Sequence, residues 1–568
     1  MLDKIHLNHY SSKKIDIIIS AILTILIVIT RVPFVSKYLY EWDSVNYALG
    51  FENFDIVHHQ PHPPGYIFYI GLGRVINTLF NDPNTTMIFI SIVFSIITVI
   101  LIYFLVKQMF SRQFAIIAAL LLVFNPLFWY YGEISTIYPT QAFLATVVAY
   151  LSYQVFRGKE KFFYPSIIAL GLAGGFRQDL IIYMFPLWFF CAFYHKRDPN
   201  RLLKAIIVLI PSVLVWVIPT MIFSGGYEQY SQASSTLYKI AFPRSSILFG
   251  STIINKLTAI GSYFAWLGLA LTYSGIIIMA LFTKYVGKGP KHIFRENIKD
   301  HRVIFLLLWF LPASIMYLLI HIAKPGYMLV FLPVLAIVLA YFVKELSYSL
   351  SSRFKKYSPK KCLTIVLSLV ILFNIAYFTV PYNINEEKLW ETPISDLNNL
   401  SPQDQVLWVL DMGFMSTHEK INADDQSTQT YLNAISQVPG SNSSNTIIVM
   451  GEITRENEGF NWRKAMYYLP DYQVYYLIEA DHFITSEWYA KNHTNTWLAS
   501  NIFKIPVNSS TQKIIWVISN QSTYFPQITS QIPVKTIDLS DGLKLYYSDV
   551  NETQIKNNEL VFNGPEQY

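Results

Sequence analysis

The chain has 568 residues, of which 53% are hydrophobic and only 14% are charged, and its net charge is +6. In soluble domains about a quarter of the residues are charged. This composition therefore excludes one large soluble domain and indicates a protein with many membrane spans. Its two cysteines, Cys191 and Cys362, lie in or beside apolar runs, so we expect neither a disulfide framework nor a cysteine-based metal cluster.

The apolar segments predict eleven membrane-spanning helices, within a range of ten to twelve. A helix needs roughly 17–25 apolar residues to cross a bilayer. The first apolar run is followed by Arg31-Val32-Pro33-Phe34 in place of a small-residue cleavage site, so we interpret it as a retained span rather than a signal peptide. The predicted spans are residues 16–35, 86–107, 113–131, 138–156, 162–176, 179–195, 203–223, 261–283, 303–322, 327–344 and 363–381.

The basic residues of the connecting loops predict how the chain is oriented in the membrane. Lys and Arg concentrate in cytoplasmic loops. With the N-terminus inside, 24 of these residues fall on the cytoplasmic side and 8 on the opposite side. Because the number of predicted spans is odd, we expect the N-terminus in the cytoplasm and the C-terminus outside.

Beyond Val380 the chain changes character. Residues 383–568 are polar, rich in Asn, Ser and Thr, and contain no further segment long enough to span a membrane. The apolar runs at 445–452, 472–479 and 513–519 predict strands, and "NWRKAMYYLP" (461–470) predicts a helix that ends at its proline.

We therefore expect two domains, a membrane module over residues 1–382 and an extracytoplasmic α/β domain over residues 383–568. N-x-S/T triplets suit an exported location, and they occur in the second domain and at Asn84, at the outer end of the second span.

The first outer loop, residues 36–85, is longer than an ordinary connector, which favours a functional role. It contains "EWDSVNYALGFENFDIVHHQPHPPGYIFY" (41–69), where acids, histidines and prolines are crowded together. "SVNYALGFENF" predicts a short interfacial helix, "PHPPG" would break it, and residues 66–80 predict a second amphipathic helix.

This acidic loop with its proline pair resembles the GT-C class of membrane glycosyltransferases. The resemblance is to the glycosyltransferase family 39 and protein mannosyltransferase-like group, together with bacterial lipid A aminoarabinose transferases. Three further segments share this resemblance, in the same order along the chain and on the same side of the membrane. They are "NPLFWYYGEISTIYPTQAFLATVVAYL" (125–151), "GLAGGFRQDLIIYMFPLW" (171–188) and "HIAKPGYMLVFLP" (321–333).

The resemblance implies a polytopic α-helical membrane protein of GT-C type that transfers a hexosyl or pentosyl group, with inversion, on the extracytoplasmic face. The donor would be a sugar on a polyprenyl phosphate, and the acceptor a protein, a glycolipid or a polysaccharide. Such a donor carries its own leaving group and membrane anchor. The absence of a G-x-x-x-x-G-K-[ST] motif fits this expectation.

In the GT-C class the first-loop aspartate is the catalytic base, and Asp43 is its match here. A positioned carboxylate can accept the proton of an acceptor hydroxyl as the hydroxyl attacks. The alternative is that Asp43 only caps the helix beginning at Ser44. The acids are adjacent in protein mannosyltransferases but separated by one residue here, so Glu41 is a second candidate. Glu133 is a third, with a solvated loop glutamate as its alternative.

Donor phosphate binding requires cations at the outer membrane boundary. Arg177, in the turn between the fifth and sixth predicted spans, offers a planar fork that suits phosphate oxygens, and Lys324 lies at an equivalent outer turn. Interfacial snorkelling is the alternative for each. Further candidates for this role are Arg74, Arg244 and His62.

His58, His59 and His62 also invite a zinc hypothesis, with Asp43 or Glu41 as fourth ligand. Adjacent histidines seldom aim at one ion, so we favour a site without a metal and keep a divalent metal as the alternative. We also predict no required cofactor and no nucleic-acid partner.

Two other functional classes stay open. A transporter or flippase would carry ionisable residues near the middle of its spans, and a surface receptor or scaffold would work through residues 383–568. The chain lacks a Trp-Trp-Asp-Tyr-Gly motif, which argues against an oligosaccharyltransferase catalytic subunit. Its soluble part is terminal, unlike the insert of a typical eukaryotic protein mannosyltransferase.

Overall fold

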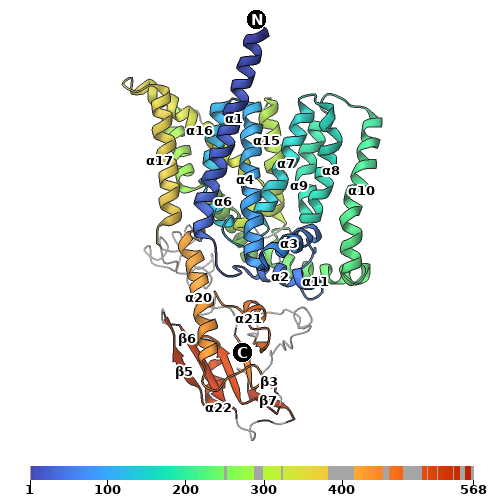
Figure 1. Cartoon of the computed structure of the whole chain (residues 1–568), viewed down its shortest axis with the longest axis vertical. Coiled ribbons are helices and arrows are strands. Elements are labelled where there is room, and N and C mark those ends of the chain that lie inside the picture. The colour runs from blue at the N-terminus through green and yellow to red at the C-terminus, as the bar shows by residue number, and fades with distance from the viewer. Residues whose placement is uncertain are drawn as a thin grey trace.

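The structure is a computed structural model of the chain. It describes residues 2–248, 253–286, 299–320, 324–381, 415–451, 459–477, 502–507, 509–520, 522, 524–540, 543–550, 555 and 557–563. Figure 1 shows a bundle of helices and, beyond one end of it, a smaller part built around a β-sheet. The N-terminus lies at the opposite end of the bundle from that sheet.

The bundle consists of the helices that precede residue 381 in the described part of the chain. They are α1 (Leu2–Arg31), η1 (Val32–Phe34), α2 (Trp42–Glu52), α3 (Ile67–Phe80), α4 (Pro83–Met109), α5 (Arg112–Val123), α6 (Pro126–Tyr131), α7 (Tyr138–Phe156), η2 (Glu160–Phe162), α8 (Phe163–Phe176), α9 (Asp179–Phe193), α10 (Pro199–Phe223), α11 (Tyr227–Ser245), α12 (Ile253–Leu271), α13 (Tyr273–Val286), α15 (His301–Leu319), η3 (Pro325–Val330), α16 (Leu332–Arg353) and α17 (Pro359–Thr379).

Among the described residues, six helices are long and apolar enough to cross a membrane, and the pair α12 and α13 makes a seventh if it is counted as one bent span. The chain is therefore a multi-pass membrane protein, but the predicted count of eleven spans is not confirmed. The other predicted spans correspond to α5 with α6, to α7, to α8 and to α9, which lie within the bundle (Figure 1).

Two of the predicted spans are interrupted, one at a capping side chain and the other at a residue with a left-handed backbone. Asn125 caps α6 by accepting hydrogen bonds from the backbone N–H groups of Leu127 and Phe128, and its amide donates to the Ala270 carbonyl at 2.8 Å. A capping asparagine starts a new helix, so the third predicted span is not continuous. The eighth bends by 85° at Thr272, whose φ is 65°.

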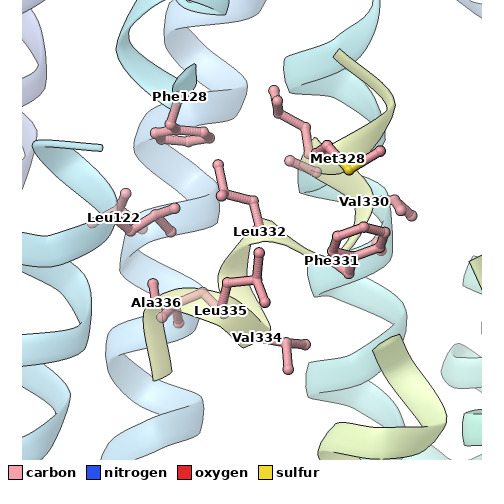
Figure 2. Packing of buried hydrophobic residues seen from close by; sticks show 14 of the residues in the cluster. Leu122, Phe128, Met328, Val330, Phe331, Leu332, Val334, Leu335 and Ala336 are labelled. Atoms are coloured by element: carbon pink, nitrogen blue, oxygen red, sulfur yellow. The ribbon is translucent and has the colours of Figure 1, made fainter. Parts of the chain in front are cut away.

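The buried side chains of η3 belong to the core of the bundle. Figure 2 shows Met328 and Val330 of η3, and Leu332 and Leu335 of α16, in one cluster with side chains of α5 and α6. All of these residues are buried. Burial of apolar side chains is the dominant favourable contribution to folding, so this packing holds the chain segment that follows Lys324 in a defined place.

The smaller part contains a mixed five-stranded sheet in the order β2-β1-β4-β6-β5 and a two-stranded sheet of β3 and β7. Strand β1 pairs in parallel with β2 and β4, while β6 is antiparallel to β4 and β5. The elements are α20 (His418–Gln437), β1 (Thr446–Met450), α21 (Trp462–Tyr468), β2 (Gln473–Tyr476), β3 (Ile502–Pro506), β4 (Lys513–Val517), α22 (Phe525–Gln531), β5 (Lys535–Asp538), β6 (Lys544–Asp549) and β7 (Glu559–Asn563).

Apolar clusters lie on both faces of the larger sheet. Helices α20 and α21 contribute to one cluster, and α22 with β3 and β7 contributes to the other. The three predicted strands are confirmed as β1, β2 and β4, and the predicted helix over 461–470 is confirmed as α21. The side chain of Asn84, in the triplet at the end of the first outer loop, is buried, and its amide donates to the Ser36 carbonyl at 2.9 Å.

Polar contacts join the sheet-containing part to the first outer loop. The carboxylate of Asp425, in α20, accepts hydrogen bonds from the Ser36 hydroxyl at 2.8 Å and from the backbone N–H groups of Lys37 and Tyr38. The Tyr468 hydroxyl, at the end of α21, accepts one from the backbone N–H of Leu39 at 2.8 Å. The terminal part therefore packs directly against the segment that leads into α2.

Candidate active site

Helix α2 begins two residues earlier than the interpretation of Asp43 as its cap requires. Its N-cap is Glu41, whose backbone N–H donates to the Ser44 hydroxyl at 3.1 Å and whose carbonyl accepts from the Ser44 N–H at 3.0 Å. Asp43 lies in the first turn, inside the helix. The alternative in which Asp43 only caps this helix is therefore wrong, and its carboxylate is available for other contacts.

The carboxylate of Asp43 faces two basic side chains. One oxygen lies 3.5 Å from Nδ1 of His62, and the other lies 4.0 Å from Nζ of Lys324. Burial would raise the pKa of Asp43, but His62, Lys324, His59 and Arg177 outweigh it and hold that pKa below its ordinary value. Asp43 is therefore ionised at neutral pH, and its side chain keeps 25% of its surface exposed.

His62 is held by the turn that follows α2. Its Nε2 lies 3.0 Å from the Tyr66 hydroxyl, and its Nδ1 makes no hydrogen bond within the described part of the chain. Burial lowers the pKa of His62, against the opposing effect of Asp43, so the ring is neutral at neutral pH. The contact between His62 and Asp43 is therefore one between a neutral imidazole and a carboxylate.

Lys324 immediately precedes η3, and the close packing of that element sets its position. A Cβ atom on Gly326 would lie 2.4 Å from the ring of Tyr138, so only glycine allows η3 to approach α7 this closely. Asp43 raises the pKa of Lys324, more than burial lowers it, so the ammonium group stays charged. Half of this side chain, 50%, is exposed and can reach a ligand.

Arg177 directly follows α8, and its side chain is oriented by Asp179, the first residue of α9. Its Nε lies 3.0 Å from each carboxylate oxygen of Asp179, and its guanidinium carbon lies 4.6 Å from the centroid of the Tyr327 ring. Its two terminal nitrogens donate no hydrogen bond to any described residue. This leaves one edge of a planar fork free for an anion such as phosphate.

The structure thus brings together four of the predicted site residues, Asp43, His62, Lys324 and Arg177, from four separate segments. Asp43 and Arg177 influence one another electrostatically, and both influence His62 and Lys324. At such a site the partly exposed Asp43 could accept a proton, and the adjacent, half-exposed Lys324 could bind an anionic leaving group.

Glu133 is placed elsewhere. Its side chain is 0% exposed, one carboxylate oxygen accepts a hydrogen bond from the Trp129 indole, and the buried guanidinium of Arg31 lies in its electrostatic field. The alternative of a solvated loop glutamate is therefore wrong. Its partners differ from those of Asp43, so Glu133 belongs to a separate buried cluster.

Two of the weaker cationic candidates also lie apart. Arg74 is exposed on α3 and donates to the Gly50 carbonyl of α2 at 2.8 Å, which ties the two interfacial helices together. Arg244 lies in α11, and its side chain lies outside the described residues.

The remaining loop histidines make structural contacts. His58 Nδ1 lies 2.7 Å from a carboxylate oxygen of Asp55, and His59 is buried. Within the described ranges, no three residues of the His, Cys, Asp and Glu types have a geometry that could hold a metal ion.

Arg463 is a residue of this region that the sequence did not single out. It is 0% exposed, its Nη2 donates to the carbonyls of His58 at 2.9 Å and His59 at 3.0 Å, and its Nε donates to the Asn46 side chain at 2.8 Å. The one available signal was a basic pair inside the otherwise apolar run "NWRKAMYYLP", and nothing local linked it to the first loop.

Comparisons with known proteins bear on the family resemblance and the fold of the chain. Residues 61–223, less than a third of the chain, match the family model of dolichyl-phosphate-mannose-protein mannosyltransferase. No curated protein sequence matches the chain.

Solved structures are similar over nearly the whole chain. ArnT from Cupriavidus metallidurans in the apo state has a TM-score of 0.54 at 11% identity, over 95% of this chain and 98% of that chain. The same protein bound to undecaprenyl phosphate has a TM-score of 0.53 at 10% identity, over 94% and 98%. This chain has the GT-C fold. The GT-C resemblance drawn from the sequence is thereby confirmed.

The oligosaccharyltransferase of Archaeoglobus fulgidus in the apo form is more distant from this GT-C chain. It has a TM-score of 0.39 at 12% identity, over 78% of this chain and 63% of that chain.

Proposed function

We propose that this GT-C chain is an integral membrane glycosyltransferase. It moves a hexosyl or pentosyl group from a polyprenyl-phosphate donor to an acceptor on the extracytoplasmic face, with inversion at the anomeric carbon. The acceptor is a protein, a glycolipid or a polysaccharide. The N-terminus is cytoplasmic, residues 1–382 form the catalytic module, and residues 383–568 form an extracytoplasmic α/β domain.

The observation that carries this proposal is the position of Asp43. This ionised carboxylate is not used to cap its helix, and it lies within 4.0 Å of Lys324 in a group that includes Arg177. A carboxylate used only for structure would be satisfied by neighbouring donors. Asp43 instead keeps accessible surface beside Lys324, half of whose side chain is exposed.

In the proposed reaction, the hydroxyl oxygen of the acceptor attacks the anomeric carbon as the bond from that carbon to the donor phosphate oxygen breaks. The hydroxyl proton passes to the carboxylate of Asp43. The sugar changes configuration because one displacement occurs from the face opposite the leaving group. Glu41, which is the N-cap of the same helix, is the second candidate for the base.

The leaving group is a polyprenyl phosphate, which gains negative charge as the glycosyl bond breaks. Lys324 and the free edge of Arg177 supply the positive charge that stabilises it. Arginine and lysine are suited to this because both remain protonated at any physiological pH. His62 lines the space beside Asp43 and offers a neutral imidazole to donor or acceptor.

The lipid-linked donor is further supported by the fold. ArnT, whose structure has a TM-score of 0.53 with this chain, is described as bound to undecaprenyl phosphate. A membrane-embedded donor also suits a protein with several membrane spans and a site formed by the segments that connect them.

The test is sugar transfer by the purified chain in detergent, with a panel of polyprenyl phosphate sugars and acceptor extracts. Asp43→Asn keeps the side-chain shape and removes the base. General base catalysis contributes typically 10²–10⁴-fold, so we expect kcat to fall by about that factor in this variant.

Two further variants make the result specific. Glu52→Gln removes an exposed acid from the other end of α2 and is expected to leave kcat within about twofold of the wild type. If Glu41→Gln loses activity and Asp43→Asn does not, the base is Glu41. If no polyprenyl donor is turned over or hydrolysed by the wild type with any extract, the proposed function is wrong.

A further inference from the structure

Helix α21, from the terminal part of the chain, packs against the helix that carries Asp43. The Trp462 ring meets the Trp42 ring edge to face, with their centroids 4.7 Å apart and their planes at 80°. Trp42 is the residue immediately before Asp43. The first turn of α2 is therefore supported by a segment more than 400 residues away in the sequence, and Arg463 makes a hydrogen bond across a separation of 417 residues.

Arg463 connects two segments of the proposed site. Its Nε donates to Asn46, one helical turn after Asp43 on α2. Its Nη2 donates to the carbonyls of His58 and His59, in the turn that leads to His62. One buried guanidinium thus holds the helix of the acid and the loop of the imidazole at a set distance.

We propose that Arg463 is a positioning residue for glycosyl transfer. It acts from the terminal part of the chain to hold α2 and the loop 58–62 so that Asp43 and His62 face one space. This inference rests on the proposed function. A planar fork with donors in two directions suits the task, because a lysine ammonium cannot span the same three acceptors.

The neighbouring Lys464 separates this role from general stability. It is on the same helix and is equally buried, but its ammonium donates to Asp424, Thr428 and the Gly459 carbonyl, which all belong to the terminal part. Losing Lys464 should weaken the terminal part without releasing the first loop. Losing Arg463 should release the first loop.

The experiment compares Arg463→Lys, Arg463→Met and Lys464→Met in the full chain, purified in detergent. Three quantities are measured: kcat, the KM for the polyprenyl phosphate sugar, and the Tm. Hydrogen exchange of peptides covering residues 42–62 reports loop order independently of activity. Because small misplacements of reacting groups can cost about 10²-fold in rate, we expect kcat to fall about 10- to 100-fold in both Arg463 variants.

The positioning role also predicts what stays unchanged. The KM for the donor should remain within about twofold in the Arg463 variants, because Lys324 and Arg177 are untouched, while exchange over residues 42–62 becomes faster. Lys464→Met should lower the Tm and leave kcat within about twofold.

Three outcomes would overturn this inference. The first is a wild-type kcat in Arg463→Met. The second is an equal loss of kcat in Lys464→Met, which would make the effect one of stability. The third is unchanged exchange over residues 42–62 in both Arg463 variants. A wild type that transfers no sugar would overturn the proposed function, and with it the catalytic part of this inference, whereas the exchange result would still decide whether Arg463 orders the loop.

Discussion

Glu41 and Asp43 show how two acids separated by one residue acquire different properties. Burial raises the pKa of Glu41 to about 7, with Lys324 opposing and Asp43 and Asp424 adding to the rise. The pKa of Asp43 is instead held below its ordinary value of 3.8, because its cationic neighbours outweigh burial. At neutral pH Asp43 is therefore a full negative charge, while Glu41 is partly protonated.

This difference predicts the pH dependence of the reaction. A base works only when it is ionised, which requires a pH above its pKa. If Asp43 is the base, lowering the pH should not reduce kcat/KM through protonation of a carboxylate until the pH falls below about 4. The measurement is kcat/KM for the purified chain between pH 5 and pH 8.5.

Glu41→Gln serves as the control for that profile. An acid limb centred near pH 7 in the wild type that disappears in Glu41→Gln would assign the base to Glu41. A profile that is the same in both proteins agrees with Asp43.

Among the elements, η3 sets the position of Lys324, the proposed donor-binding cation. This short helix follows Lys324 directly, and its buried side chains pack with α5 and α6, as Figure 2 shows. Gly326 lies against the ring of Tyr138, whose atoms near the backbone cannot move away cheaply. The position of Lys324 relative to Asp43 therefore depends on the fit between η3 and α7.

Gly326→Ala tests this fit. The added Cβ would lie 2.4 Å from the Tyr138 ring, so η3 must shift and carry Lys324 with it. Core overpacking costs typically about 1–3 kcal/mol, so we expect the KM for the donor to rise about 5- to 100-fold and the Tm to fall.

Gly71→Ala provides the matched control, because an added Cβ there meets no atom within 4 Å. It should leave the KM unchanged and maintain or raise the Tm, since alanine favours the helix more than glycine does. An unchanged donor KM in Gly326→Ala would show that η3 does not position the binding cation.

In the whole molecule, helix α2, which carries Asp43, and the N-terminal end of α1 lie at opposite ends of the bundle (Figure 1). Helix α2 and the terminal part that contacts it are at one end, and the N-terminus is at the other (Figure 1). At that other end Arg112 lies 3.3 Å from Asp16 of α1. Basic residues are retained on the cytoplasmic side, so the candidate site should face outward.

Cysteine labelling tests this orientation. Both native cysteines are buried, so an added one is the principal accessible thiol. We expect Ser443→Cys, at an exposed position before β1, to react with an impermeant maleimide in intact cells of the expression host. We expect Arg197→Cys, exposed between α9 and α10, to react only after permeabilisation. The reverse pattern would contradict the predicted orientation.

Much of this organisation follows from local sequence. Apolar length predicts the spans, although Asn125 and Thr272 interrupt two of them because a cap and a left-handed residue end a helix that composition alone would continue. The two interfacial helices of the first loop are found as α2 and α3. Asp43, His62, Arg177 and Lys324 were identifiable because each is a titratable residue at an outer turn in a segment with a family resemblance.

The relations among those residues have no local signature. That Glu41 caps α2 and leaves Asp43 free depends on where the helix begins, and the burial of Glu133 beside Arg31 depends on how α1 packs against α6. Arg463 reaches the first loop through hydrogen bonds to backbone carbonyls, which any residue presents and which therefore leave no pattern in the loop sequence. Composition thus determines which segments are apolar enough to enter a membrane, and the sequence shows which residues are available for chemistry. Which of them meet is decided by long-range packing, because contacts between distant segments exist only once the chain has folded.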